Sequence, residues 1–313
     1  MSRTCAFPIF IDVELTNKCN LECLFCVTGT GMQIRKAGYM SDETFMKIMD
    51  NIKDKESGLR FMGWGEPTLH PRLADYIRIA KKAGHLTHLS TNGQLVDKNL
   101  ADKLLDSGLD SIIFTFQGVN KQQYEEVMHG GDYDKLLTNV RTLFQKRGNR
   151  SLPFIHCKTS IINESDIEDI EIFKKKVEPI CDLVTCGATQ FNHINLDKVK
   201  LDKGSIEKLK IMKTKEQMLK RHKICGPCWG MTVIDYQGHL HLCNHDFNEE
   251  MLIGDINNNT ISEIFNGNKK NEYRDLILNT IIPKQEFFRN PICNDCYDYM
   301  SWEERLVRIQ ENI

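Results

Sequence analysis

Two patterns of apolar and polar positions alternate along this 313-residue chain. Apolar residues recur at helical spacing and predict five helices, at 41–53, 71–83, 98–107, 133–146 and 166–176. Between them, short runs rich in β-branched and aromatic residues predict six strands, at 7–14, 59–62, 86–90, 111–116, 154–162 and 182–185. Repeated strand–helix order is typical of an α/β fold with a parallel sheet and helices outside. The loops that follow the strands are then expected to carry the functional site.

The pattern changes after residue 197. Residues 198–223 are rich in lysine and place Ile206, Leu209, Met212 and Leu219 on roughly one helical face. This stretch predicts a linker helix between a first domain at 1–197 and a cysteine-rich domain at 224–313. Its basic side chains either dock an acidic electron carrier or form a solvated helix face. In the last domain, residues 231–236 and 239–242 flank Gln237-Gly238 and predict a β-hairpin.

Composition limits the possible partners and the compartment. Lys and Arg number 41 against 43 Asp and Glu, so the formal charge of −2 gives no general attraction to nucleic acid or to an anionic membrane. No apolar run approaches the roughly 20 residues that span a bilayer. The chain has twelve cysteines, but it is much longer than the small domains that need disulfides for stability. The cysteines therefore indicate metal ligation in a reducing setting. We therefore expect a cytoplasmic protein without membrane or nucleic-acid partners.

Three cysteines, Cys19, Cys23 and Cys26, follow the first predicted strand at CxxxCxxC spacing. The spacing brings three thiols onto one short loop, and no fourth ligand lies nearby. Such a set suits an iron–sulfur cluster better than zinc, and a cubane held by three thiolates keeps one iron open to another molecule. The alternative is three small buried side chains, which the polar neighbours Asn20 and Glu22 disfavour.

The cysteine motif, with aromatic Phe25 directly before Cys26, resembles that of the radical S-adenosylmethionine (SAM) enzymes. The resemblance implies a partial (β/α)6 barrel, with a [4Fe-4S] cluster in the loop after the first strand and SAM bound to its open iron. The second strand ends in Gly63-Trp-Gly65-Glu66-Pro67, which looks like the GGEP motif that holds the SAM amine in this family. Paired glycines let the backbone approach a ligand closely, and a carboxylate accepts bonds from an ammonium.

The resemblance assigns three further polar residues to SAM. Asn92 follows the third strand, Gln117 the fourth and Asn163 the fifth, where the family binds ribose, carboxylate and adenine. Gln117 stands where relatives often have an acidic residue, and it alternatively faces the substrate. Alternatively, Asn92-Gly93 forms an ordinary turn and has no ligand role.

The C-terminal cysteines resemble those of the SPASM and twitch extensions of radical SAM enzymes. On that match Cys225, Cys243, Cys293 and Cys296 hold one auxiliary [4Fe-4S] cluster, since no cysteine follows Cys296. The alternative is a zinc ribbon, which would use Cys228 and leave Cys243 idle. With the iron–sulfur assignment, Cys228 is either a hydrogen donor to a substrate radical or a packing residue.

The resemblance also implies the chemistry. A flavodoxin or ferredoxin-type donor reduces the first cluster, SAM yields a 5′-deoxyadenosyl radical, and the radical removes a substrate hydrogen atom. We expect oxidation of a secondary alcohol on a sugar or aminocyclitol-like substrate, with Asp246 as candidate base. Epimerisation and peptide or protein maturation are alternatives. Only eighteen residues precede Cys19, which favours a small or carbohydrate substrate over a leader peptide. A non-catalytic metal-binding module would leave the motifs after successive strands unexplained.

Overall fold

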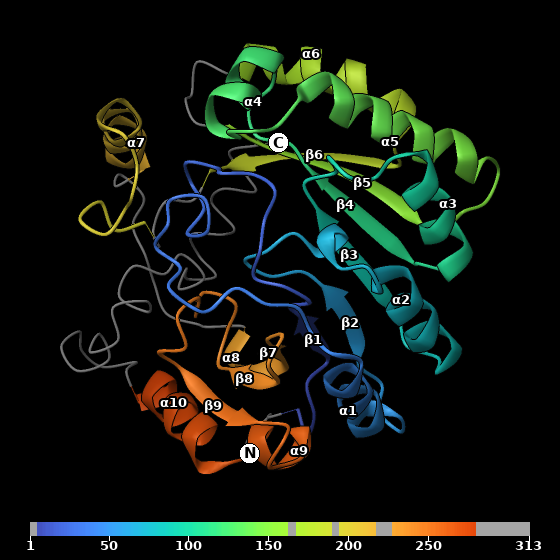
Figure 1. Cartoon of the computed structure of the whole chain (residues 1–313), viewed down its shortest axis with the longest axis vertical. Coiled ribbons are helices and arrows are strands. Elements are labelled where there is room, and N and C mark those ends of the chain that lie inside the picture. Colours follow the sequence, from blue (N-terminus) through green and yellow to red (C-terminus); the bar gives the residue numbers. More distant parts are fainter. Residues whose placement is uncertain (1–4, 162–166, 190–193, 217–226, 280–313) are drawn as a thin grey trace.

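The computed structural model describes residues 5–161, 167–189, 194–216 and 227–279. Its centre is one sheet with the strand order β6-β5-β4-β3-β2-β1-β7-β8-β9 (Figure 1). Six of these strands form the parallel part that the sequence predicts, β1 (Phe10–Val13), β2 (Gly58–Phe61), β3 (Thr87–Thr91), β4 (Ser111–Thr115), β5 (Phe154–Ile161) and β6 (Leu183–Ala188). The expected α/β fold and partial barrel are therefore confirmed.

The helices of this part cover the outer face of the sheet, as Figure 1 shows for α2, α3, α5 and α6. Their bounds are α1 (Asp42–Ile52), α2 (Leu73–Lys82), α3 (Lys98–Ser107), α4 (Lys121–Val127), α5 (Tyr133–Arg147) and α6 (Ile167–Val177). Four of them begin at a polar N-cap, because the side chains of Ser41, Asp97, Asn120 and Asp132 each accept a backbone N–H bond. The five predicted helices are confirmed, and α4 is an additional one.

Alternate residues of the parallel strands face two different surroundings. Leu59, Phe61 and Leu89 are fully buried against the helices. Their neighbours Arg60 and His88 are on the opposite, inner face and are only partly buried. The sheet thus has an apolar outer side, which holds the core, and a polar inner side, which is available for a site.

The predicted hairpin is present as β7 (Met231–Ile234) and β8 (His239–His241). Gly238 at the turn has φ 95°, a conformation that favours glycine. A third antiparallel strand, β9 (Leu252–Asp255), follows, and short helices complete the region, α8 (Pro227–Gly230), α9 (Ile261–Phe265) and α10 (Asn268–Asn279). Strand β7 pairs in parallel with β1, so the hairpin continues the barrel sheet instead of forming a separate one.

Helix α7 (Lys203–Glu216) lies inside the predicted linker at 198–223. The division of the chain into domains at 197 and 224 stays a prediction. Among the described residues, no helix combines the length and apolar character that crossing a bilayer requires. Four predicted site residues lie outside the described residues, Asn163, Cys225, Cys293 and Cys296.

Candidate functional site

The three-cysteine loop follows β1 and is folded tightly on itself. The Cys26 N–H donates to the Cys23 carbonyl oxygen at 3.1 Å, and the Leu21 N–H lies 3.5 Å from the Cys19 sulfur. A Cβ atom on Gly29 would come within 2.4 Å of the Cys23 backbone, so only glycine fits there. Burial raises the pKa of the Cys19 thiol to about 11, and the neighbouring Cys26 and Glu66 add to this effect. Burial thus disfavours the thiolate form, and a bound metal is needed to hold the three sulfurs ionised.

The loop after β2 packs directly against the start of the cysteine loop. The Glu66 N–H donates to the Lys18 carbonyl oxygen at 2.7 Å. This approach requires glycine before it, because a Cβ on Gly65 would lie 2.1 Å from the Thr16 carbonyl oxygen. Pro67 then opens a 3₁₀ turn, Pro67–Leu69. Gly65 and Pro67 thus fix the backbone against the cluster loop.

The Glu66 carboxylate is buried and ties two loops together. Its Oε1 accepts bonds from the Thr68 N–H at 3.0 Å, the Thr68 hydroxyl at 2.6 Å and the Thr91 hydroxyl at 2.7 Å. Its Oε2 accepts from the Asn92 N–H at 2.8 Å. Burial raises the pKa of this carboxyl, while the four bonds oppose the rise. Much of the acceptor capacity that the sequence assigns to the SAM amine is thus used within the protein.

The other described SAM candidates lie near the ends of their strands. Asn92 donates from its amide to Asn20 Oδ1 at 2.9 Å and accepts from the Gln94 N–H at 3.0 Å, so its side chain faces the cysteine loop. Gln117 is buried and donates to the Thr189 hydroxyl after β6. Phe25 is partly buried against the core. Their contacts with SAM stay predictions.

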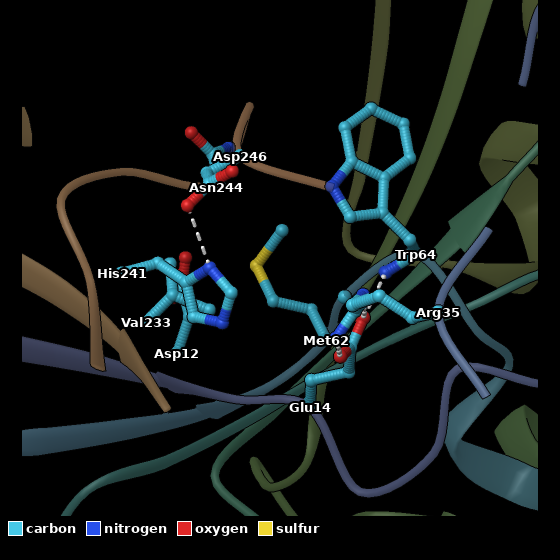
Figure 2. A pocket seen from close by; sticks show the side chains of 10 residues that line it. Asp12, Glu14, Arg35, Met62, Trp64, Val233, His241, Asn244 and Asp246 are labelled. Atoms are coloured by element: carbon cyan, nitrogen blue, oxygen red, sulfur yellow. Dashed lines mark hydrogen bonds and ion pairs between the residues drawn. The ribbon is translucent and has the colours of Figure 1, made fainter. Parts of the chain in front are cut away.

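A cavity of about 180 Å³ lies between the ends of β1 and β2 and the hairpin region (Figure 2). Asp12 from β1 and Glu14, the first residue after that strand, form part of its wall, and Trp64 comes from the loop after β2. Asn244 and Asp246 come from the segment between β8 and β9. The Trp64 ring packs edge-on against Phe247, with centroids 5.7 Å apart. The cavity therefore joins the predicted SAM-binding loop to the C-terminal region.

A buried ion pair connects the walls of this cavity. Both terminal nitrogens of Arg35 contact Glu14, at 2.7 and 2.9 Å, and its Nε donates to the Phe247 carbonyl oxygen at 2.8 Å. Glu14 also accepts the Trp64 N–H at 3.0 Å. The pair thus joins β1, the Trp64 loop and the C-terminal region. The sequence analysis missed both residues; an acidic residue closing the first strand was the available signal for Glu14, whereas Arg35 follows no recognisable pattern.

His241 bridges two carboxylates. Its Nδ1 lies 2.9 Å from Asp246 Oδ2, and its Nε2 lies 3.1 Å from Asp235 Oδ2. Burial alone would lower the pKa of His241, but the bonds to Asp235 and Asp246 raise it to about 9. Asp246 further accepts from the backbone N–H groups of Glu250 and Met251, each at 2.8 Å. The predicted base is therefore engaged in holding its own loop and His241, and its catalytic role stays a prediction.

The two described C-terminal cysteines are buried. Cys228 lies in α8, just before Gly230, whose carbonyl oxygen accepts the Ile9 N–H at 2.8 Å. It therefore lies by the start of β1, whereas the Cys19 loop follows the end of that strand. This placement favours packing over hydrogen donation. Cys243 follows β8 by two residues, and its ligand role stays a prediction.

The sequence matches two family models. Residues 13–171 match the radical SAM superfamily, and residues 225–297 match SPASM, an iron–sulfur cluster-binding domain. Among curated relatives, the tungsten-containing aldehyde ferredoxin oxidoreductase cofactor-modifying protein of Pyrococcus furiosus is 33% identical over 34% of this chain and 30% of its own. The PqqA peptide cyclase of Granulibacter bethesdensis is 27% identical over 38% of this chain and 32% of its own. The matches thus span about a third of these relatives.

Solved structures share the fold over most of the chain. Native anSMEcpe with bound AdoMet has a TM-score of 0.65 at 17% identity, covering 98% of this chain and 100% of that one. BtrN in complex with AdoMet and 2-DOIA has a TM-score of 0.56 at 16% identity and covers 87% of both chains. Streptococcus suis SuiB bound to the precursor peptide SuiA has a TM-score of 0.63 at 14% identity, covering 85% of this chain and 66% of that one.

The donor set fits the cofactors that these families bind. Three thiols on one loop are the soft ligands that an iron–sulfur cluster takes. The glycine contacts at Gly29 and Gly65 hold that loop against the next one. SAM and a [4Fe-4S] cluster belong to the first domain, and auxiliary iron–sulfur ligation belongs to the second. The chain belongs to the radical SAM superfamily and carries a C-terminal SPASM domain.

Proposed function

We propose that this radical SAM enzyme catalyses a two-electron oxidation of a secondary alcohol on a sugar or aminocyclitol-like substrate. The observation that carries the proposal is the cavity beside the Trp64 loop, whose walls combine carboxylates, an imidazole and an amide within about 180 Å³. Small sites with a few convergent polar groups suit a small polar ligand. The cavity also lies between the two regions that match the two iron–sulfur families.

We assign the SAM-binding cluster to Cys19, Cys23 and Cys26, and one auxiliary cluster to Cys225, Cys243, Cys293 and Cys296. When bound, these groups supply the electron that cleaves SAM to methionine and a 5′-deoxyadenosyl radical, and an acceptor for the electron left on the substrate. The residues assigned to SAM itself are Phe25, Gly65, Glu66, Pro67, Asn92, Gln117 and Asn163.

Alcohol oxidation also requires an acceptor for the hydroxyl proton. Asp246 lines the cavity and is our candidate, with the proton received at a carboxylate oxygen. The bonds that it accepts from His241 and from two backbone N–H groups fix the orientation of its carboxylate in the cavity wall. The Arg35–Glu14 pair keeps the surrounding walls in place.

Peptide modification is the second candidate. Two relatives are peptide cyclases by name, and a structure of the same fold is bound to a precursor peptide. In this case the cavity would receive one side chain of the peptide. Radical epimerisation requires a thiol that returns a hydrogen atom, and the position of Cys228 by the start of β1 gives that role no support.

We propose a flavodoxin or ferredoxin-type electron donor. The described helix α7 carries five lysines, Lys203, Lys208, Lys210, Lys213 and Lys215, and an acidic carrier would be attracted to such a charge excess. Figure 1 shows α7 apart from the sheet and its covering helices.

The test begins with anaerobic reconstitution. Two cubanes predict about eight iron per chain, and a Cys19, Cys23, Cys26 triple alanine variant keeps about four. The reduced protein is then incubated with SAM and separate panels of polyols, aminocyclitols and peptides, and 5′-deoxyadenosine is measured by mass spectrometry. Alcohol oxidation predicts a product two mass units lighter than a polyol. About four iron plus one zinc would contradict the auxiliary-cluster assignment, and turnover with peptides alone would replace the first candidate with the second.

A further inference from the structure

The inner face of the parallel strands β2 to β6 is basic. Residues that pair across neighbouring strands point to the same side of the sheet, so the register extends this face from Arg60 and His88 to the later strands. On β5 it places His156 and Lys158 on the inner side. None of the inward-facing positions within β2 to β6 is Asp or Glu. We call Arg60, His88, His156 and Lys158 the basic row.

The basic row departs from the usual interior of such a barrel, which bulky branched apolar side chains fill. The outward-facing neighbours follow the usual pattern, as Ile155 is apolar and fully buried beside His156. On the inner face, Lys158 is exposed, the Arg60 side chain is 29% exposed, and His88 and His156 are half-buried. A ligand can therefore reach the row.

The two imidazoles of the row are held in fixed orientations. His88 Nδ1 lies 2.8 Å from the Ser111 hydroxyl, and His156 Nε2 lies 2.7 Å from the Thr185 hydroxyl. The other ring nitrogens, His88 Nε2 and His156 Nδ1, have no hydrogen-bond partner among the described residues and are not sealed from solvent. When the hydroxyl donates to the first nitrogen, the second carries the proton and offers an N–H to a ligand.

The two permanent cations of the row also keep donors free. Arg60 Nε donates to Asp12 Oδ1 at 2.5 Å, and the guanidinium carbon lies 5.4 Å from the centroid of the Phe10 ring. These contacts fix the guanidinium, whose Nη1 donates no hydrogen bond to the described residues. Lys158 Nζ forms neither an ion pair nor a hydrogen bond with the described residues. The row thus keeps one uncompensated lysine charge and the free edge of an arginine.

The members of the row interact with one another as like charges. Burial, with the charges of Arg60 and His156, lowers the pKa of His88 to about 4. Burial, with the charge of Lys158, lowers the pKa of His156. The four side chains therefore lie within electrostatic range of their neighbours along the row, and an anion placed there is attracted to all of them.

The row begins at the edge of the cavity. Arg60 pairs directly with Asp12 on β1, and Asp12 lines the cavity beside the Trp64 loop. From there the row crosses β2 and β3, the strands that lead into the loops of Glu66 and Asn92. These loops are assigned to SAM, so a molecule on the row lies on the side of the sheet where the proposed chemistry occurs.

We infer that the basic row binds an anionic group of the substrate, a phosphate or a carboxylate. The inference rests on the proposed function and narrows its substrate class to acidic sugars or cyclitols, such as sugar phosphates and uronates. Donors on arginine, lysine and histidine form short, strong hydrogen bonds with such anions. An uncharged or cationic substrate would leave the Lys158 charge without a partner and is expected to bind more weakly.

Binding is measured by isothermal titration calorimetry on the reconstituted, SAM-loaded protein without reductant, so that no turnover occurs. The anionic probes are glucose 6-phosphate and glucuronate, which separate a phosphate site from a carboxylate site. The comparison ligands are glucose, glucosamine and inorganic phosphate. We expect at least one anionic probe to bind at least tenfold more tightly than each of the three comparison ligands.

Substitutions on the row test where the anion binds. Lys158→Gln removes the exposed charge and should raise the Kd of the anionic probe roughly fivefold or more, whereas Lys158→Arg should stay within about threefold. His156→Phe removes an N–H donor and should also weaken binding. The matched control is Lys98→Gln, because Lys98 is an exposed lysine on α3, on the outer side of the barrel. It should leave the Kd within about twofold of the wild-type value.

Three results would overturn the inference. The anionic probes bind no more tightly than glucose, Lys158→Gln and Lys98→Gln change the Kd equally, or inorganic phosphate binds as tightly as the anionic sugar. Circular dichroism and SAM affinity show that each variant is folded, and the exposed Lys158 tolerates substitution even where His156→Phe does not fold. Oxidation of uncharged polyols without any preference for anionic probes would refute this inference alone. Anion binding on the row without polyol or sugar turnover would refute the proposed function instead.

Discussion

Glu66, in the loop after β2, and Asp12, in β1, are both buried carboxylates, yet their surroundings differ. Glu66 accepts four bonds from Thr68, Thr91 and Asn92, all supplied by the loops after β2 and β3. Asp12 is contacted by Arg60 at one oxygen, and its other oxygen is buried without a hydrogen-bond partner among the described residues. The first arrangement completes a scaffold from residues near in sequence. The second leaves one oxygen without a bond, and the cavity that Asp12 lines is completed by residues more than 200 positions away. Local completeness thus marks the loops assigned to SAM (the SAM side), and long-range completion marks the cavity proposed for the substrate (the substrate side).

The largest effect is expected on the SAM side. Changing Cys19, Cys23 and Cys26 to alanine removes every thiol of the first loop, so SAM cleavage should fall to background and about half of the iron should be lost. The measurement is 5′-deoxyadenosine formation together with an iron assay. Cys5→Ala is the control and should retain both. Substantial cleavage by the triple variant would mean that the SAM side has been placed in the wrong loop.

On the substrate side, Arg35→Met tests the long-range ion pair. It leaves Glu14 buried without its bidentate partner, and the free energy of unfolding should fall by about 3–5 kcal/mol. Urea denaturation of the anaerobic protein measures it. Arg72→Met removes an exposed ion pair and should cost less than about 1 kcal/mol. Equal losses in the two variants would show that the buried pair has no special role in joining the two regions.

The inner face near Asp12 also predicts a pH dependence. Burial, with the charges of Arg60 and His156, lowers the pKa of His88 from 6.5 to about 4. The unfolded chain therefore binds a proton between pH 6.5 and 4 that the folded protein does not. Stability should fall as pH decreases through this window, by up to about 3 kcal/mol. Urea midpoints at pH 7, 5.5 and 4.5 measure it. His88→Gln should flatten the slope, and an unchanged slope would assign the effect to other groups.

The smallest of these effects is expected from Glu66→Gln. The side chain keeps its shape but replaces an acceptor oxygen with a donor, so the bond from the backbone N–H of either Asn92 or Thr68 is lost. The expected cost is about 1–3 kcal/mol of unfolding free energy, with weaker SAM binding because the two loops are no longer tied. Thermal denaturation and SAM titration measure both. A variant with normal stability and lost SAM affinity would point instead to direct contact between Glu66 and SAM.

The sequence predicts the scaffold well because its signals are local. Period-two and helical spacing placed β1 to β6 and five helices, and the Gln237-Gly238 turn placed the hairpin. Helix α4 was missed since its seven residues are mostly polar. The cavity could not be predicted in the same way. Arg35 lies 3.6 Å from Asp235, although the two residues are 200 positions apart in the sequence. Hydrophobic periodicity carries no information about such a long-range contact.

The parallel pairing of β7 with β1 has a consequence for how the protein is made. Strand β1 is synthesised early, but one of its two neighbours begins only at Met231. At roughly 5–20 residues per second on the ribosome, that edge waits on the order of 10 to 40 s for its partner. During this interval its backbone N–H and C=O groups can pair with another nascent chain. Slow translation between these strands, or a break in the chain between them, should therefore raise aggregation, and chaperones that shield strand edges should lower it.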